Sequence, residues 1–234
     1  MVFWLCLPFL SNAQTAHYLI VADTDDYIIG NISNNVCEYF QQTFAPTMHQ
    51  KFGWENHSVY EKHLRDNSID YQIDNLQTSS NDVIFFYYSG HGCNSANTNE
   101  QFPAFYLNGK FCWERDIYEK LKSKPHKLLI VIAETSNRIF DMLNSNPPIN
   151  GTNSTQVSDY QTNYIVSSCK RNQDSYFENG YDYFFSSFKE AFEEEIKSNN
   201  SNLSWDNIFI TTAIKTEQKA LENGTEQTPQ WIKE

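Results

Sequence analysis

The sequence predicts an α/β domain, a three-layer αβα sandwich in which helices cover both faces of a mostly parallel central sheet. Two apolar runs, residues 83–88 and 128–133, support this prediction. Neither run alternates between apolar and polar residues, and strands of that kind are buried on both faces. Segments with helical spacing alternate with the strands along the chain, as they do in layered α/β domains.

The first third of the chain supplies strands and helices in turn. We expect a strand over residues 17–23, because apolar residues fill it. Apolar residues at helical spacing then predict a helix over 33–44, which Pro46 should end. A short strand over 51–54 and a helix over 71–76 lead into the run at 83–88.

The rest of the chain continues the same alternation. Asn108 and Gly109 are typical of a tight turn and predict a hairpin over 105–113. Residues 144–159 are rich in Asn, Pro, Ser and Thr, so we expect an exposed linker there, with a processing segment as the alternative. The remaining predicted elements are a strand over 164–169 and helices over 113–121, 183–196 and 205–221.

Length and charge limit the classes of function. A chain of 234 residues makes one domain that can bury a sizeable core. The net charge of −12 disfavours nucleic acids and anionic membranes as partners, because both would repel the protein. A basic partner or substrate is favoured instead. The oligomeric state is left open.

The N-terminus resembles a secretory signal peptide. An apolar stretch over residues 1–10 is followed by small residues that resemble a cleavage site after Ala13. We therefore expect residues 1–14 to be a signal peptide and residues 15–234 to be the domain, which would be secreted or periplasmic. The stretch has no Lys or Arg, so a wrongly assigned start or a buried strand in a cytoplasmic protein stays open. No other segment reaches the roughly 20 apolar residues of a membrane span.

Neither the cysteines nor the histidines follow a metal-binding pattern. The four cysteines beyond residue 14 match no zinc or disulfide spacing, and we expect them to be reduced. His49, His57 and His63 lie close together in sequence but lack the i, i+4 spacing of zinc ligands on a helix. We therefore predict no metal site.

Two strand ends carry the residues with chemical potential. His91 lies between two glycines after the run at 83–88, and Ser136 follows the run at 128–133. Ligands bind beyond the carboxyl ends of parallel strands, and a base and a nucleophile there could meet. The flanking glycines would leave room for a substrate atom. A core histidine in a tight turn is the alternative interpretation.

Three segments carry a resemblance to a known family. They are Ser89-Gly90-His91-Gly92, Glu134-Thr135-Ser136-Asn137, and Ser168-Cys169 with Gln173 and Ser175. Taken together, these motifs resemble the caspase-like cysteine peptidases, especially bacterial and metacaspase-type members. Legumain-type peptidases share part of the pattern and are the nearest alternative. The resemblance implies a caspase-haemoglobinase-like fold, hydrolysis of peptide bonds in peptide or protein substrates, and no cofactor, with the calcium dependence of the metacaspase branch left open.

The resemblance also implies roles for single residues. His91 would be the base, and the Gly92 N–H and the amide of residue 136 would bind the oxyanion. Ser136 stands where the family has its nucleophilic cysteine. A hydroxyl is far less acidic than a thiol and needs a base that a third group orients, and no acid is evident beside His91 in the sequence. Cys93 as a substitute nucleophile would lie at the wrong strand end.

The serine leaves three interpretations open. The chain is a natural pseudopeptidase, an inactivated form, or a serine-dependent enzyme, in that order of preference. A pseudopeptidase would bind peptides or a partner without cutting them.

Substrate contacts are implied in the same way. The metacaspase branch cleaves after Arg or Lys through an acidic pocket, and Asp23 is the candidate wall of such a pocket, with Asp25 or Asp26 as alternatives. Ser168, Cys169 and Gln173 would also contact the substrate.

Overall fold

The two apolar runs form the centre of a six-stranded sheet. A computed structural model describes residues 14–61, 68–107, 110–140, 161–178, 180–198 and 203–234. The strand order is β12-β9-β7-β3-β1-β2, and neighbouring strands are parallel except β12, which is antiparallel to β9. The strands are β1 (Thr15–Ala22), β2 (Glu55–Glu61), β3 (Val83–Ser89), β7 (Leu128–Glu134), β9 (Thr162–Ser167) and β12 (Gln230–Lys233).

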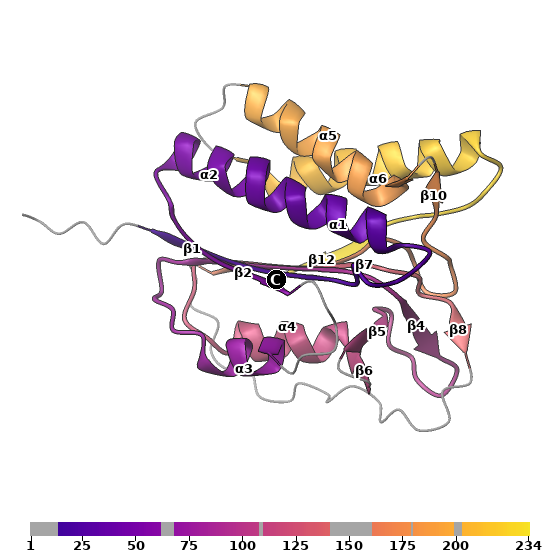
Figure 1. Ribbon diagram of the computed structural model, residues 1–234, viewed down its shortest axis with the longest axis horizontal. Coiled ribbons are helices and arrows are strands. Elements are labelled where there is room, and N and C mark those ends of the chain that lie inside the picture. The colour runs from indigo at the N-terminus through magenta and orange to yellow at the C-terminus, as the bar shows by residue number, and fades with distance from the viewer. Residues whose placement is uncertain (1–13, 62–67, 108–109, 141–160, 179, 199–202) are drawn as a thin grey trace, which may run out of the picture.

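Helices cover both faces of this sheet, which confirms the predicted sandwich (Figure 1). On one face lie α1 (Gly30–Tyr39), α2 (Ala45–Phe52), α5 (Tyr183–Lys197) and α6 (Trp205–Glu222); on the other lie α3 (Ser68–Asn75), α4 (Glu114–Lys122) and the hairpin of β5 (Ala104–Leu107) and β6 (Lys110–Trp113). Each layer buries its own apolar cluster. Phe40, Phe44 and Phe188 belong to the first cluster, and Phe86, Ile117 and Leu121 to the second.

Strands β3 and β7 are paired in a register that fixes where their chains leave the sheet. Every residue of β3 is buried, and its last residue, Ser89, lies opposite Glu134, the last residue of β7. The segments that follow therefore start side by side. Because parallel strands end at the same edge, this edge also receives the loop after β1.

The prediction that Pro46 ends the first helix is wrong. The chain continues from α1 through one π-helical turn, Phe40–Phe44, into α2. Pro46 lies in the first turn of α2, where a missing N–H is tolerated. The strand predicted over 51–54 is also wrong, because α2 extends to Phe52. The helix ends at Gly53, whose φ of +68° favours glycine.

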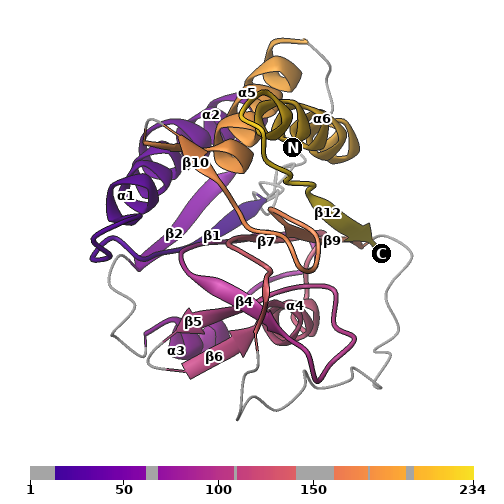
Figure 2. The ribbon, with the colours of Figure 1, turned by 90° about the vertical axis from the view of Figure 1, so that its right-hand side faces the viewer.

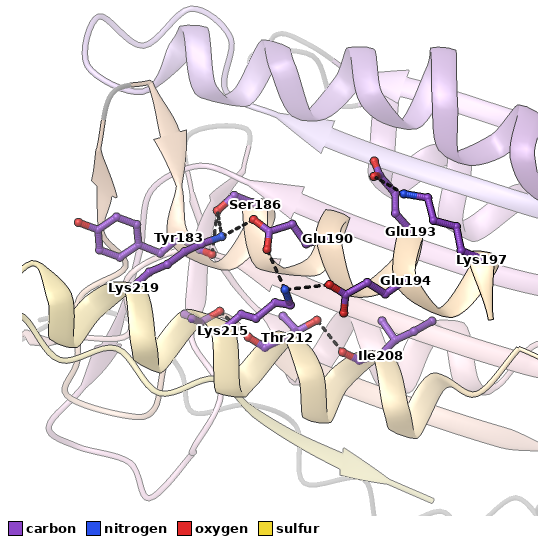
Figure 3. Close-up of polar contacts among 11 residues, drawn as sticks. Tyr183, Ser186, Glu190, Glu193, Glu194, Lys197, Ile208, Thr212, Lys215 and Lys219 are labelled. Carbon is purple, nitrogen blue, oxygen red and sulfur yellow. Dashed lines mark hydrogen bonds and ion pairs between the residues drawn. The ribbon is translucent and has the colours of Figure 1, made fainter.

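Two features at the C-terminal end complete the sandwich. The tail after α6 forms β12, an edge strand that the sequence did not indicate. Helices α5 and α6 are also linked by ion pairs, drawn in Figure 3. Lys215 contacts Glu190 and Glu194 at 3.0 Å each, and Lys219 contacts Glu190 at 2.8 Å. These pairs are exposed and add little to stability, and they link α6 to α5, whose first residues adjoin the edge where β3 and β7 end.

Several predictions fall on residues outside the described ranges. These are most of the expected signal peptide, the linker over 144–159, the turn at Asn108 and Gly109, and His63. Within the described ranges, no helix has both the length and the apolar character needed to cross a bilayer. The described histidines, cysteines and carboxylates likewise form no group of three suited to hold a metal ion.

Candidate active site

The glycines on either side of His91 are required for packing. A Cβ on Gly90 would lie 2.4 Å from the Tyr88 hydroxyl, and a Cβ on Gly92 would lie 2.4 Å from Thr135 Oγ1 and 2.7 Å from the carbonyl oxygen of Ala104. The positions that a side chain would occupy at these two glycines are therefore filled by the protein itself. Gly92 is the first residue of strand β4 (Gly92–Ser95). The part predicted for its N–H in an oxyanion hole stays a prediction.

His91 forms a hydrogen bond with Asp26, a residue in the loop after β1. The distance from His91 Nε2 to Asp26 Oδ2 is 3.1 Å, and the imidazole side chain is 57% exposed whereas the carboxylate is 16% exposed. The sequence-based expectation that no acid lies beside His91 is wrong. The two residues meet because β1 and β3 are neighbouring parallel strands.

Asp26 is held in place by the backbone. Its other oxygen, Oδ1, accepts hydrogen bonds from the amides of Ile28 at 2.7 Å and Ile29 at 2.9 Å. Partial burial would raise the pKa of Asp26, but these two amides and His91 outweigh it and hold the pKa below its ordinary value. A carboxylate therefore faces the imidazole at neutral pH.

Ser136 lies at the neighbouring strand end and shares a cleft with His91. It follows β7 by two residues, and both side chains line a cleft of about 130 Å³. The Ser175 amide donates a hydrogen bond of 3.1 Å to Ser136 Oγ, which leaves the hydroxyl proton available to an acceptor. Figure 2 looks onto this edge of the sheet, where α1, β4 and β10 (Phe177–Glu178) surround the strand ends. The cleft is lined by Ile28, Ile29, Ile32, Ser33, Ser89, Gly90, His91, Glu134, Thr135, Ser136, Ser175, Phe177 and Asp182.

Two buried carboxyl groups, Glu134 and Asp182, also line this cleft. Glu134 is 4% exposed and Asp182 is 5% exposed. Burial and then the charge of Asp182 raise the pKa of Glu134 well above its ordinary value, and burial also raises the pKa of Asp182. The pair therefore retains a proton at pH values where an exposed glutamate is ionised. Sequence reasoning missed this pair because Asp182 lies 48 positions beyond Glu134 in the chain.

A hydrogen-bond network supports the loop that carries Ser175. Asp182 caps α5 by accepting from the Phe185 amide at 3.0 Å, and its other oxygen accepts from Ser175 Oγ at 3.0 Å. Gln227, which is 1% exposed, donates to Ser175 Oγ at 3.1 Å and accepts from the Tyr176 amide at 2.9 Å. The position of the Ser175 amide, and with it the orientation of Ser136, depends on this network.

The other predicted substrate contacts lie outside the cleft lining. Ser168 and Cys169 are fully buried and bond to the Thr135 carbonyl at 3.0 and 3.4 Å, while Gln173 accepts from the Thr228 amide at 2.9 Å. These bonds brace the segment that carries Ser136. Their assignment as substrate-binding residues stays a prediction.

Asp23 is also absent from the lining, although it lies near His91. Burial, then the charge of Asp26, raises the pKa of Asp23. Among the carboxylates proposed for the pocket wall, the structure brings Asp26 into hydrogen-bond contact with His91, and the predicted role of Asp23 stays a prediction.

The thiols of Cys93 and Cys169 are poor nucleophiles in this environment. Burial raises the pKa of Cys93 to about 11 and that of Cys169 to about 12. Cys93 lies in β4 and is 6% exposed. Ser136 is therefore the better candidate nucleophile at this edge of the sheet.

Comparisons with known proteins identify the fold and the family. The caspase domain profile matches residues 40–233. Caspase-1 from Spodoptera frugiperda superposes with a TM-score of 0.59 at 12% identity, over 94% of this chain and 85% of that one. A protein from Geobacter sulfurreducens gives 0.53 at 14% identity, over 94% and 93%. A search of curated protein sequences found no match. The predicted caspase-like fold is confirmed, and the chain belongs to the caspase domain family.

Proposed function

We propose that the cleft binds a peptide and that its chemistry is peptide-bond hydrolysis, with His91 as the base and Ser136 at the nucleophile position. The observation that carries the proposal is the placement of both side chains in one cleft, at the ends of neighbouring parallel strands. A nucleophile beside a base at a sheet edge is the arrangement that acyl transfer requires.

The hydrolytic step is impaired, because oxygen replaces sulfur. A cysteine near pKa 8.5 yields a thiolate beside a histidine, whereas a serine must lose its proton as it attacks. The loss should be several orders of magnitude in rate, comparable to removal of a member of a catalytic triad. The native chain is thus a slow enzyme or a pseudopeptidase.

The cleft favours a basic side chain in the substrate. Glu134 and Asp182 bring two carboxyl groups to its wall, and the whole chain carries a net charge of −12. An arginine or lysine side chain would let the pair ionise and would compensate its buried charge. In this proposal Glu134 and Asp182 form the acidic wall, and the part predicted for Asp23 stays a prediction.

The decisive experiment compares the native chain with Ser136→Cys on peptides that carry Arg, Lys or Asp before the scissile bond. We expect Ser136→Cys to cleave Arg and Lys peptides on the order of 10³-fold faster than the native chain. The double variant that combines His91→Ala with Ser136→Cys is the matched control and should show no cleavage. If Ser136→Cys neither cleaves nor reacts with a thiol-directed peptide probe, the proposal is wrong.

A second candidate is a binding module that holds peptides or a partner without cutting them. The observation that favours it is the hydroxyl of Ser136 itself, which preserves the shape of the nucleophile position while removing the thiol. This candidate predicts saturable binding of basic peptides to the native chain and no product, even after prolonged incubation. Binding by calorimetry and product analysis by mass spectrometry on the same sample distinguish the two.

A further inference from the structure

We propose that Asp26 is a positioning residue that holds the His91 imidazole as the tautomer able to accept the Ser136 proton. Asp26, His91 and Ser136 then form an arrangement like the catalytic triad of serine hydrolases. This inference rests on the proposed function. It adds a third group to the pair of residues that the family resemblance implied.

The contact between Asp26 and His91 fixes where the imidazole proton lies. A carboxylate only accepts hydrogen bonds, so the proton of a neutral His91 must lie on Nε2, which is 3.1 Å from Asp26 Oδ2. The basic nitrogen is then Nδ1. The same carboxylate also stabilises the imidazolium that forms when Nδ1 takes a proton.

The two oxygens of Asp26 have separate tasks. Oδ1 accepts from the amides of Ile28 and Ile29 and thereby forms an Asx-type turn just before α1. This turn needs only one oxygen. Because both amides hold Oδ1, the second oxygen points to His91 with a fixed geometry, which a residue serving only as a turn former would not require.

An oxygen nucleophile needs such a partner more than a thiol does. A thiol and an imidazole can exchange a proton before the substrate arrives, whereas a serine hydroxyl transfers its proton only during attack. In the proposed step, the Ser136 Oγ–carbon bond forms as the hydroxyl proton moves to Nδ1 and the carbonyl electron pair moves to its oxygen. The C–N bond then breaks as Nδ1 returns that proton to the leaving amine. Water releases the acyl group by the same route.

Asp26→Asn tests the positioning without removing the turn before α1. The amide oxygen of the substituted side chain can still accept from Ile28 and Ile29, but its NH₂ group now faces Nε2 and makes that nitrogen an acceptor. The proton should therefore move to Nδ1. Imidazole ¹⁵N NMR on the native background should show the Nε2–H form, and Asp26→Asn should show the Nδ1–H form. Asp25→Asn, which removes the same charge one residue away, should keep the Nε2–H form. An unchanged tautomer in Asp26→Asn would overturn the proposal.

Kinetics in two backgrounds provide the second readout. Asp26→Asn should lower kcat by about 10²- to 10⁴-fold when the nucleophile is Ser136, by analogy with the loss of the acidic member of other triads. In the Ser136→Cys background the decrease should be at least tenfold smaller, and KM should change little in either. Asp26→Glu should recover part of the loss, because it restores an acceptor. Equal losses in both backgrounds would mean that Asp26 only supports the fold and would sink the inference.

The two proposals fail in different ways. If no variant cleaves peptides and the Ser136→Cys variant takes up no probe, the proposed function is wrong, and the NMR tautomer still decides whether Asp26 orients His91. If Ser136→Cys cleaves peptides but Asp26→Asn changes neither the tautomer nor kcat, the function stands and the role of Asp26 is refuted.

Discussion

Gly92, the residue after His91, packs directly against Thr135, the residue before Ser136. The segments that follow β3 and β7 are therefore in close contact beside the candidate base and nucleophile. A Cβ at residue 92 would stand 2.4 Å from Thr135 Oγ1 and 2.8 Å from Thr135 Cγ2. A real Cβ essentially never lies this close to a non-bonded atom, so the surrounding atoms would have to shift. The relative placement of His91 and Ser136 depends on the absence of a side chain at this glycine.

Gly92→Ala should therefore destabilise the protein by about 1–3 kcal/mol, the usual cost of forcing extra volume into a packed region. Urea denaturation measures the effect. Thr135→Ala removes both side-chain atoms that the new methyl group meets, and Oγ1 forms no hydrogen bond with the described residues. The double variant should thus recover part of the loss. Additive effects of the two substitutions would show that the clash lies elsewhere, for example at the Ala104 carbonyl oxygen.

Asn137 should be essential for stability, although it follows the candidate nucleophile directly. Its side chain is fully buried, donates to the Gln101 carbonyl at 2.7 Å and accepts from Asn94 Nδ2 at 2.8 Å. Asn137→Ala should lower the free energy of unfolding by about 2–4 kcal/mol, because it strands buried polar groups. Thermal unfolding followed by circular dichroism checks this. A loss below about 0.5 kcal/mol, the range of a surface substitution, would contradict it.

The sequence predicted the layers of this fold because burial leaves a periodic record. Strands β3 and β7 have no polar face, and α4 and α5 carry apolar residues at helical spacing, so both types of element could be placed by pattern alone. The continuation of α1 into α2 could not be predicted in this way, because Pro46 breaks a helix in most contexts. It is tolerated here because it lies in the first turn of α2.

The site was predictable only in part. His91 and Ser136 each follow an apolar run, and this is a local signal. The hydrogen-bond partner of His91 could not be predicted, because Asp26 is one of three acids in one loop. Only the pairing of β1 with β3 decides which of these acids meets the imidazole. Asp182 likewise reaches the cleft through the packing of α5. An aspartate directly before a helix was the available signal for Asp182, which is the N-cap of α5. The signal for Asp26 was an aspartate in a loop, a residue type that forms turns through bonds to the amides that follow it.

Binding of basic peptides should strengthen as the pH rises. Glu134, whose pKa is raised by burial and by Asp182, keeps its proton in the empty cleft, and a guanidinium group would favour its ionised form. Binding then releases a proton, so the affinity for an Arg peptide should increase as the pH rises above the range in which an exposed glutamate ionises. Calorimetry in buffers of different ionisation enthalpy measures the proton release directly.

Glu134→Gln provides the control for this pH dependence. The amide keeps the shape of the side chain but cannot ionise, so affinity should be lower and its dependence on pH much weaker. A citrulline peptide, which lacks the charge, should bind the native chain without proton release. If the affinity of the native chain for the Arg peptide is independent of pH, Glu134 does not contact the basic side chain.

Asp82 should account for part of the acid sensitivity of the fold, at the opposite end of the sheet from the cleft. Its carboxylate accepts from the Ser79 amide at 2.8 Å and contacts His17 Nε2 at 3.2 Å. Burial would raise the pKa of Asp82, but these hydrogen bonds outweigh burial and lower it, and burial lowers the pKa of His17. Both groups therefore bind protons more weakly in the folded chain than in the unfolded chain. Their stabilisation is fully present above the unfolded-state pKa values and is lost as the pH falls through the folded-state values.

The measurement is the free energy of unfolding in urea at a series of pH values from about 7 to 2, where an unfolded histidine and then an unfolded aspartate take up protons. The native chain should lose stability steadily over this range, and Asp82→Asn should be less stable at pH 7 but should lose less on acidification. Asp74→Asn is the matched control, since Asp74 forms an ion pair with Lys120 in which both side chains are well exposed, and its profile should follow that of the native chain. Parallel profiles for the native chain and Asp82→Asn would show that the ionisation of this carboxylate does not govern acid unfolding.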